Sequence, residues 1–255
     1  MEPLLFAFRY FSNLPIPGKA GWDEKTTAAS LTWLPLTGAV IGICLAVLAI
    51  FFRNIGFPQT PALLAISIAA LDLWVGSARF VDGFAKTAEG MFSGLGSKRS
   101  LEMMRDSRIG ARGALGLVLA ALAKVLLLAE LSLQADFFYV LVFYPCWSRW
   151  AVSFCAYAYP AAEEEGMAFF FKIGQKPAYI IMGSAFMLLV LLLMPRHFYA
   201  GALLSFAALL FCNSLVLSRL GGQTEETYGL AAVATELSFL FFCALSGLLF
   251  GYIGG

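Results

Sequence analysis

Three charged residues, Asp82, Lys86 and Glu89, occupy positions i, i+4 and i+7 of the sequence, with Gly83 and Gly90 beside them. On a helix this spacing places the three side chains along one stripe. Carboxylates and glycines next to an apolar run suit a metal ion and a phosphate group. Asp82 and Glu89 would be about 10 Å apart along a straight helix, so a bend or another carboxylate would have to complete a metal site. An ion-pair ladder on a solvated face is the alternative that the spacing leaves open.

A second polar cluster follows, in which Arg105 and Arg108 flank Asp106 and Ser107, with Gly110 two residues further on. Guanidinium forks and open backbone N–H groups suit phosphate oxygens. The alternative is an interfacial helix whose charges meet lipid head groups.

The third candidate segment places Gly221 and Gly222 directly before Thr224 and Glu226. A Gly-Gly turn before a helix N-terminus can bind an anion through its backbone N–H groups. This signal is weak by itself. The same expected helix carries Glu236 further along, inside an apolar run.

One acid, Asp72, lies inside an apolar run of its own. An acid within a membrane segment is costly and is usually functional. Asp72 could instead pair with Lys124 or Arg149, which also lie inside apolar runs. His197 is the only histidine, and we expect it to be an ordinary surface residue.

The composition indicates the class of protein. Of the 255 residues, 60% are hydrophobic and 13% are charged. A soluble domain is about half apolar and a quarter charged, so an all-α polytopic membrane protein is expected. The formal net charge of +1 gives no basic footprint for nucleic acid. The five cysteines lie inside apolar runs without a CxxC pair, which favours packing over disulfides or zinc.

The expected organisation is one transmembrane helical domain covering residues 1–255, with an amphipathic N-terminal segment at 1–33. Seven apolar runs have about the length that a bilayer requires: 34–52, 61–80, 114–134, 137–158, 178–194, 198–217 and 230–252. Polar loops are expected at 81–112, 159–177 and 218–229. On the side of the membrane opposite these polar loops, Arg53 and Arg196 are the only Lys or Arg in the expected loops. The positive-inside rule therefore places the three polar loops in the cytoplasm, where they can build one site.

Taken in order, these segments resemble the cobalamin synthase family, adenosylcobinamide-GDP ribazoletransferase, over nearly the whole chain. The matching wording is FAFRYFSNLPIP, Leu34-Pro35-Leu36-x-Gly38, Asp82-Gly83-Phe84-Ala85-x-Thr87-Ala88-x-Gly90, Leu101-Glu102-x-Met104-x-Asp106-Ser107-Arg108-x-Gly110 and Arg219-Leu220-Gly221-Gly222-x-Thr224. The sequence departs from the family pattern where Phe80 replaces a histidine and where Lys86, Glu89 and Glu226 replace aspartates. In the middle loop, Tyr159 stands where the family has an arginine.

The resemblance implies a magnesium-dependent transfer that joins adenosylcobinamide-GDP to α-ribazole, or its 5′-phosphate, and releases GMP. It implies an integral protein of the bacterial or archaeal cytoplasmic (inner) membrane whose active site faces the cytoplasm. The substrates and the lipid bilayer are the expected partners, without nucleic acid, and the sequence leaves a homo-oligomer open. A membrane phosphotransferase with another alcohol substrate is one alternative. A transporter is the other, although transporters typically place polar sites at the midplane of broken or repeated spans.

The residues would then divide by role. Catalytic roles are expected for Asp82, Glu89 and Asp106, and magnesium ligation for Asp82, Glu89 and Glu226. Substrate binding is expected for Lys86, Arg105, Ser107, Arg108, Gly221, Gly222 and Thr224. Lys86 has no counterpart in the family pattern, and we expect its ammonium to replace part of the charge of a metal and to contact the substrate pyrophosphate.

Overall fold

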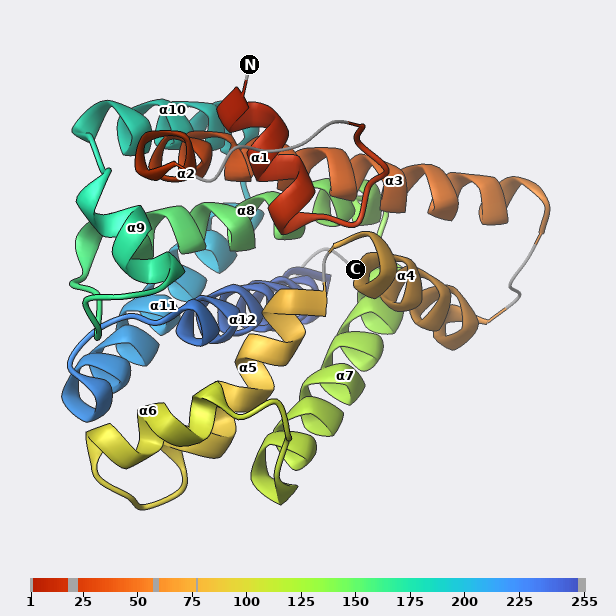
Figure 1. Ribbon diagram of the computed structural model, residues 1–255. Coiled ribbons are helices and arrows are strands. Elements are labelled where there is room, and N and C mark those ends of the chain that lie inside the picture. Colours follow the sequence, from red (N-terminus) through yellow and green to blue (C-terminus); the bar gives the residue numbers. More distant parts are fainter. Residues whose placement is uncertain (1, 18–22, 57–59, 77, 252–255) are drawn as a thin grey trace.

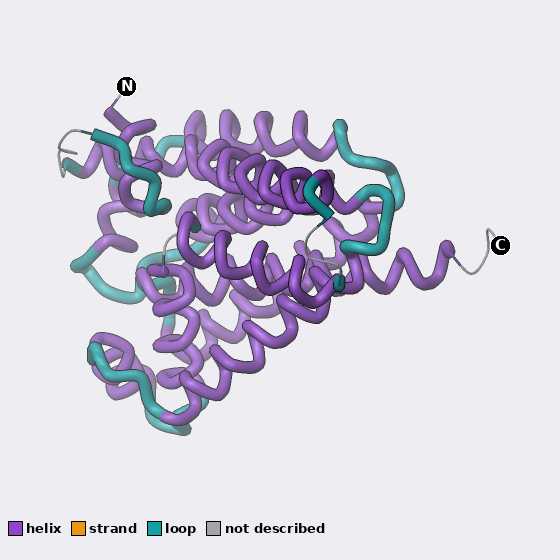
Figure 2. Tube along the Cα trace, turned by 90° about the vertical axis from the view of Figure 1, so that its right-hand side faces the viewer, coloured by secondary structure: helices purple, strands orange, loops and turns teal. Residues whose placement is uncertain are grey.

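The computed structural model describes residues 2–17, 23–56, 60–76 and 78–251, and within these ranges the chain forms helices and no strand (Figures 1 and 2). The α-helices are α1 (Glu2–Phe11), α2 (Glu24–Ser30), α3 (Leu34–Asn54), α4 (Pro61–Val75), α5 (Ala78–Met91), α6 (Ser97–Arg105), α7 (Ala111–Leu131), α8 (Phe137–Ala158), α9 (Met167–Ile173), α10 (Pro177–Leu192), α11 (Phe198–Leu220) and α12 (Glu225–Gly251). A short 3₁₀ helix, Leu31–Trp33, joins α2 to α3.

Four helical segments of the described chain are long and apolar enough to cross a membrane: Glu24–Asn54, Ala111–Leu131, Phe198–Leu220 and Glu225–Ser246. Two further pairs, α4 with α5 and α9 with α10, meet the same criteria as broken spans, with bends of 94° and 101°. The protein is therefore an all-α polytopic membrane protein. The expected number of seven spans is not reached by these criteria, which give four to six, and it stays a prediction.

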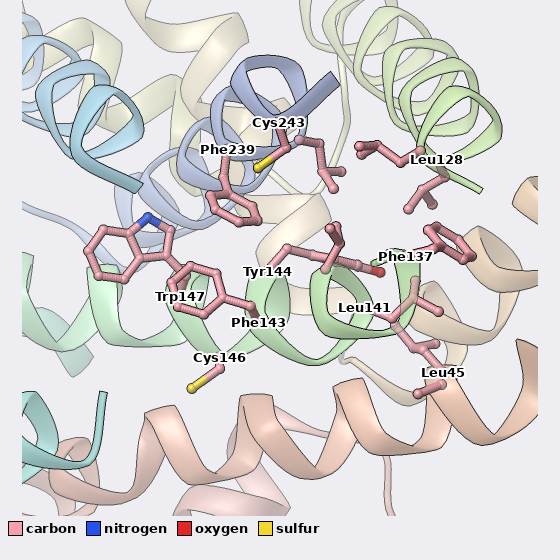
Figure 3. Close-up of a cluster of buried hydrophobic side chains, with 14 of the residues drawn as sticks. Leu45, Leu128, Phe137, Leu141, Phe143, Tyr144, Cys146, Trp147, Phe239 and Cys243 are labelled. Atoms are coloured by element: carbon pink, nitrogen blue, oxygen red, sulfur yellow. The ribbon is translucent and has the colours of Figure 1, made fainter. Parts of the chain in front are cut away.

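The helix at the centre of the fold is α8, whose bounds coincide with the expected fourth span although it is not among those segments. It lies between α3 and α12, and Figure 3 shows Phe143, Tyr144 and Trp147 directed into the surrounding core. Because protein rather than lipid covers α8, it can hold the buried Arg149.

Small residues let α3 approach α8 closely. A β-carbon at Gly38 would lie 2.6 Å from the α-carbon of Cys146, and one at Gly42 would lie 2.6 Å from the carbonyl oxygen of Leu141. Close backbone contact of this kind is a usual basis of helix packing in membranes, because no hydrophobic force drives helices together in lipid.

The structure corrects the expected polar loops. Most of the stretch 81–112 is helical, because α5 continues from residue 78 and α6 follows it. The expected second span stops at Val75, short of residue 80, and the chain then turns into α5. The stretch 159–177 contains α9, and only residues 221–224 separate α11 from α12. The expectation of a loop fails at 81–91 because the polar side chains occupy one face of a helix whose other face, with Ala85 and Ala88, is buried against the bundle.

The amphipathic N-terminal segment expected at 1–33 contains the helices α1 and α2. Residues 18–22 of this segment lie outside the described part of the chain. Asp23 caps the start of α2, since its carboxylate accepts a hydrogen bond from the backbone N–H of Thr26 at 3.0 Å.

Candidate functional site

The three polar segments meet at one end of the helical bundle, on the left and lower left of Figure 1, away from the end of α3. Arg105, at the end of α6, forms an ion pair with Glu163 at 2.7 Å. The backbone N–H of Gln223 donates to the carbonyl of Pro160, and that of Ala162 donates to the carbonyl of Gln223, both at 2.8 Å. Residues from 81–112, 159–177 and 218–229 are thus in direct contact, as the sequence predicts.

Two glycines bring α5 against the beginning of α12. A β-carbon at Gly83 would lie 2.8 Å from the carbonyl oxygen of Glu226, and one at Gly229 would overlap the carbonyl oxygen of Phe80. The close approach places the charged stripe of α5 beside the first turn of α12, which carries Glu225 and Glu226. Acidic side chains are favoured there by the positive end of the helix dipole.

The first half of the charged stripe forms an ion pair. The Lys86 ammonium lies 2.8 Å from the Asp82 carboxylate, with 18% of the Lys86 side chain and 47% of the Asp82 side chain exposed. The pair is partly exposed to solvent, which screens its attraction, so it contributes only modestly to stability. Either group can therefore exchange its partner for an incoming ligand at small cost.

The second half of the stripe has a different partner. The Glu89 carboxylate accepts a hydrogen bond from the backbone N–H of Gly113 at 2.8 Å and lies 3.7 Å from the Arg112 guanidinium. Glu89 thus satisfies a free N–H in the first turn of α7. The structure supports the ladder interpretation for Asp82 and Lys86 but gives Glu89 a capping contact in α7.

The Asp106 carboxylate organises its own turn. Its Oδ1 accepts from the backbone N–H of Arg108 at 2.9 Å, and its Oδ2 accepts from the Arg108 guanidinium at 3.1 Å. These hydrogen bonds lower the pKa of Asp106 below its ordinary value and raise the pKa of Arg108. The side chains of Arg105 and Arg108 are 59% and 88% exposed, and Ser107 is exposed beside them. The segment presents two cations to solvent, which suits a phosphate-bearing ligand.

The Gly221–Thr224 turn is shaped by its backbone. Gly221 adopts the left-handed conformation, with φ of 84°, that ends α11. A β-carbon at Gly222 would lie 2.6 Å from the carbonyl carbon of Ala161. Thr224 and Thr227 cap each other, since each hydroxyl accepts from the backbone N–H of the other residue. Thr224 therefore fixes the start of α12, and its role toward a substrate stays a prediction.

The three expected metal ligands, Asp82, Glu89 and Glu226, do not come together as a metal site. Within the described ranges, no three His, Cys, Asp or Glu residues lie close enough together to hold a metal ion. The capping contact of Glu89 accounts for part of this difference. Asp82 and Glu226 remain on adjacent helices, and Mg²⁺ bound to phosphates needs only one or two carboxylates. These two residues are the remaining candidates for such an ion, and magnesium binding stays a prediction.

Tyr10, Arg79 and Glu225 form a cluster at this end of the bundle that the sequence did not predict. The Tyr10 hydroxyl donates to Oε1 of Glu225 at 2.5 Å, and the Arg79 guanidinium lies 3.4 Å from the same oxygen. The guanidinium also lies 4.2 Å above the Tyr10 ring. Burial, together with the charge of Glu225, raises the pKa of Tyr10. No local spacing could reveal this contact, because Tyr10 and Glu225 are 215 residues apart.

Asp72 has the ion-pair partner that the sequence analysis offered as an alternative. Lys124 forms ion pairs with both Asp72 and Glu236, and the Tyr144 hydroxyl donates to Asp72 at 3.0 Å. Arg149 donates to the carbonyl of Gly76 instead. This buried cluster lies within the helical bundle, apart from the three polar segments.

The fold and the site define an integral membrane protein with acidic and arginine side chains gathered at one end of an all-α bundle. The profile of the family described as cobalamin-5-phosphate synthase matches residues 3–244, and the chain belongs to this family. It is 32% identical to proteins named adenosylcobinamide-GDP ribazoletransferase from Shigella boydii and from Escherichia coli strain K12. Each alignment covers 94% of this chain and 98% of the relative. No solved structure matches the chain.

Proposed function

We propose that this protein is an adenosylcobinamide-GDP ribazoletransferase, which joins adenosylcobinamide-GDP to α-ribazole, or to its 5′-phosphate, and releases GMP. One observation carries the proposal: the three polar segments, two of which resemble the family, lie far apart in the sequence and meet through Arg105–Glu163 and through the backbone pairing at Gln223. The family membership and the names of the relatives support the same reaction.

The reaction requires a hydroxyl of α-ribazole to attack the phosphorus that carries cobinamide. A new O–P bond forms, the P–O bond to GMP breaks, and the hydroxyl loses its proton. Lys86, Arg105 and Arg108 would bind the pyrophosphate oxygens and offset the charge that collects on the leaving GMP. Asp82 would orient the hydroxyl and accept its proton once Lys86 turns to the phosphate.

Magnesium fits this proposal as a cofactor held by Asp82 and Glu226. When bound, the ion would neutralise the pyrophosphate as a Lewis acid. Position 86 carries a lysine where the family pattern has an aspartate, so fewer carboxylates would be available to a metal ion. Phosphate binding would then depend more on the Lys86 ammonium.

We also propose that the site faces the cytoplasm from the inner membrane of a bacterial or archaeal cell. The excess of Lys and Arg on the side of the three polar segments supports this orientation. The bilayer would surround the apolar faces, such as the exposed Leu115, Leu119 and Leu122 of α7.

The test is a reaction with purified protein in detergent. Adenosylcobinamide-GDP, α-ribazole and Mg²⁺ are supplied, and GMP and the corrinoid product are measured by liquid chromatography and mass spectrometry. We expect GMP and joined corrinoid in equal amounts, and neither without α-ribazole. Folded protein that forms neither product over a wide range of Mg²⁺ would overturn the proposal. Product from another alcohol but none from α-ribazole would favour the alternative of a membrane phosphotransferase with another alcohol substrate.

A further inference from the structure

Gln223 lies in the turn between α11 and α12 and is buried, although glutamine is usually a surface residue. Only 1% of the residue is exposed. Its side-chain nitrogen donates to Oδ1 of Asn213 at 2.6 Å, and its side-chain oxygen accepts from the Thr227 hydroxyl at 2.7 Å. A buried amide is stable only when it is hydrogen-bonded. These two hydrogen bonds therefore hold the side chain in one orientation.

The two partners of the Gln223 side chain are themselves fixed. Asn213 is 2% exposed, and its amide nitrogen donates to the carbonyl of Leu209 at 2.8 Å, one turn earlier on α11. The Thr227 hydroxyl accepts from the backbone N–H of Thr224 at 2.8 Å. The network therefore runs from the body of α11, through Gln223, to the first turn of α12.

The backbone of Gln223 holds the middle polar segment at the same time. Its N–H donates to the carbonyl of Pro160, and its carbonyl accepts from the N–H of Ala162, both at 2.8 Å. Glu163 follows directly after this pairing, and its carboxylate forms the ion pair with Arg105 at 2.7 Å. The position of Gln223 therefore determines where Glu163 holds the arginine.

The same network fixes the acidic side of the candidate site. The hydrogen bond to Thr227 anchors the first turn of α12, which carries Glu226. The backbone of Glu226 packs closely against Gly83, the neighbour of Asp82 on α5, because a β-carbon at Gly83 would lie 2.8 Å from the carbonyl oxygen of Glu226. Movement of the turn would thus change the separation between Arg105 and the acids of α5 and α12.

We propose that Gln223 is a positioning residue of the transferase reaction, an inference that rests on the proposed function. It keeps the phosphate-binding arginine of α6 and the acids of α5 and α12 at the separation that the substrate pyrophosphate requires. Gln223 acts through these groups, because both polar ends of its buried side chain are hydrogen-bonded within the protein. Its loss leaves every substrate-binding side chain present but less well placed, so the main effect falls on substrate binding.

The first experiment measures the kinetics of Gln223→Met in detergent. Methionine is similar in length and keeps the backbone pairing, but it cannot donate to Asn213 and is only a weak acceptor for Thr227. We expect the KM for adenosylcobinamide-GDP to rise roughly three- to tenfold, the effect of one buried hydrogen bond, with kcat changed less than about twofold. Asn213→Leu removes the same contact from the side of α11 and should raise KM in the same way. It decides the question if Gln223→Met does not fold.

Ser205→Ala is the matched control. Ser205 also lies on α11, is fully buried and accepts a hydrogen bond from the Trp147 indole at 2.8 Å within the apolar core. Its substitution should lower the melting temperature without changing KM. A rise in KM that simply follows the loss of stability, in Ser205→Ala as well as in Gln223→Met, would show a general structural effect and overturn the proposal.

Hydrogen–deuterium exchange with mass spectrometry tests the anchor without turnover. In Gln223→Met, the amides of residues 159–166 and 221–228 should exchange roughly threefold faster or more, and Ser205→Ala should leave them unchanged. Unchanged exchange in Gln223→Met overturns the proposal whatever reaction the protein catalyses. An unmodified protein that forms no product contradicts the proposed function itself. Normal turnover of the unmodified protein, with an unchanged KM in Gln223→Met, contradicts only the role of Gln223.

Discussion

The ammonium of Lys86 lies 2.8 Å from the carboxylate of Asp82, one helical turn earlier on α5. The contact joins a residue at which this chain departs from the family pattern to an acid that matches the pattern. Asp82 is therefore balanced by a cation at the position where the resemblance to the family leads one to expect a second acid. The pairing makes Lys86 the position that most directly tests how this protein handles phosphate.

Substitutions at Lys86 test whether this side chain takes part in binding the substrate and the metal. We expect Lys86→Met to raise the KM for adenosylcobinamide-GDP by roughly tenfold, because one charged contact to the pyrophosphate is lost. Lys86→Asp should increase the number of Mg²⁺ ions bound, which isothermal titration calorimetry measures in the presence of substrate. Lys98→Met is the control, since Lys98 is an exposed lysine on α6. If both variants keep the original affinity and metal stoichiometry, Lys86 does not belong to the site.

Asp82 should be essential for turnover. Asp82→Asn keeps the size of the side chain and removes its charge, so we expect kcat to fall by roughly a hundredfold or more while the protein stays folded. Steady-state kinetics and thermal unfolding in detergent measure the two effects. Glu102→Gln, at an exposed acid of α6, is the matched control. Near-normal turnover of Asp82→Asn at limiting Mg²⁺ would remove Asp82 from the chemistry.

Glu89 should act mainly on stability. Its carboxylate accepts from the N–H of Gly113 in the first turn of α7, and only 14% of the side chain is exposed. We expect Glu89→Ala, which removes the acceptor, to lower the free energy of unfolding by about 1 kcal/mol, as the loss of a helix cap does. The measurement is unfolding monitored by circular dichroism, alongside the Mg²⁺ dependence of turnover. An unchanged melting temperature with a raised Mg²⁺ requirement would instead support the metal-ligand role.

Tyr10 should hold α1 against the beginning of α12. Tyr10→Phe keeps the ring but removes the hydroxyl that donates to Glu225. We expect a loss of about 1–2 kcal/mol, because a hydrogen bond to a charged acceptor is stronger than a neutral one. Thermal unfolding measures it, with Tyr139→Phe, at an exposed tyrosine, as the control. Equal effects of the two substitutions would show that the hydroxyl of Tyr10 adds nothing to stability.

The membrane orientation can be tested by cysteine accessibility. Cysteines introduced at the exposed Gly94 and Glu164 should react with a membrane-impermeant maleimide from the same side, and one at Arg196 from the opposite side. The unmodified chain gives the background reaction, which can come from the partly buried Cys44 and Cys212, because the other three cysteines are buried. Reaction of Gly94 and Glu164 positions from opposite sides would contradict a single site.

Much of the fold could be predicted because the signals are local. A run such as 137–158 must form a helix in a membrane, where every backbone group needs an internal partner, and α8 has those bounds. The i, i+4 spacing of Asp82 and Lys86 likewise implied their contact. The alternative that Asp72 pairs with Lys124 is confirmed, since a buried acid needs a nearby base.

The remaining features depend on which helices pack together. Glu89 could have paired with Lys86, yet the placement of α7 offers it the N–H of Gly113. The sequence contains no sign that Tyr10 meets Glu225, or that Glu236 joins Asp72 around Lys124. The sequence by itself therefore determined the class of the protein, its resemblance to a family and its long apolar helices, but not the short helices α6 and α9. Only the tertiary structure decided the partner of each charge, because helix packing brings distant side chains together and burial makes an unpaired charge costly.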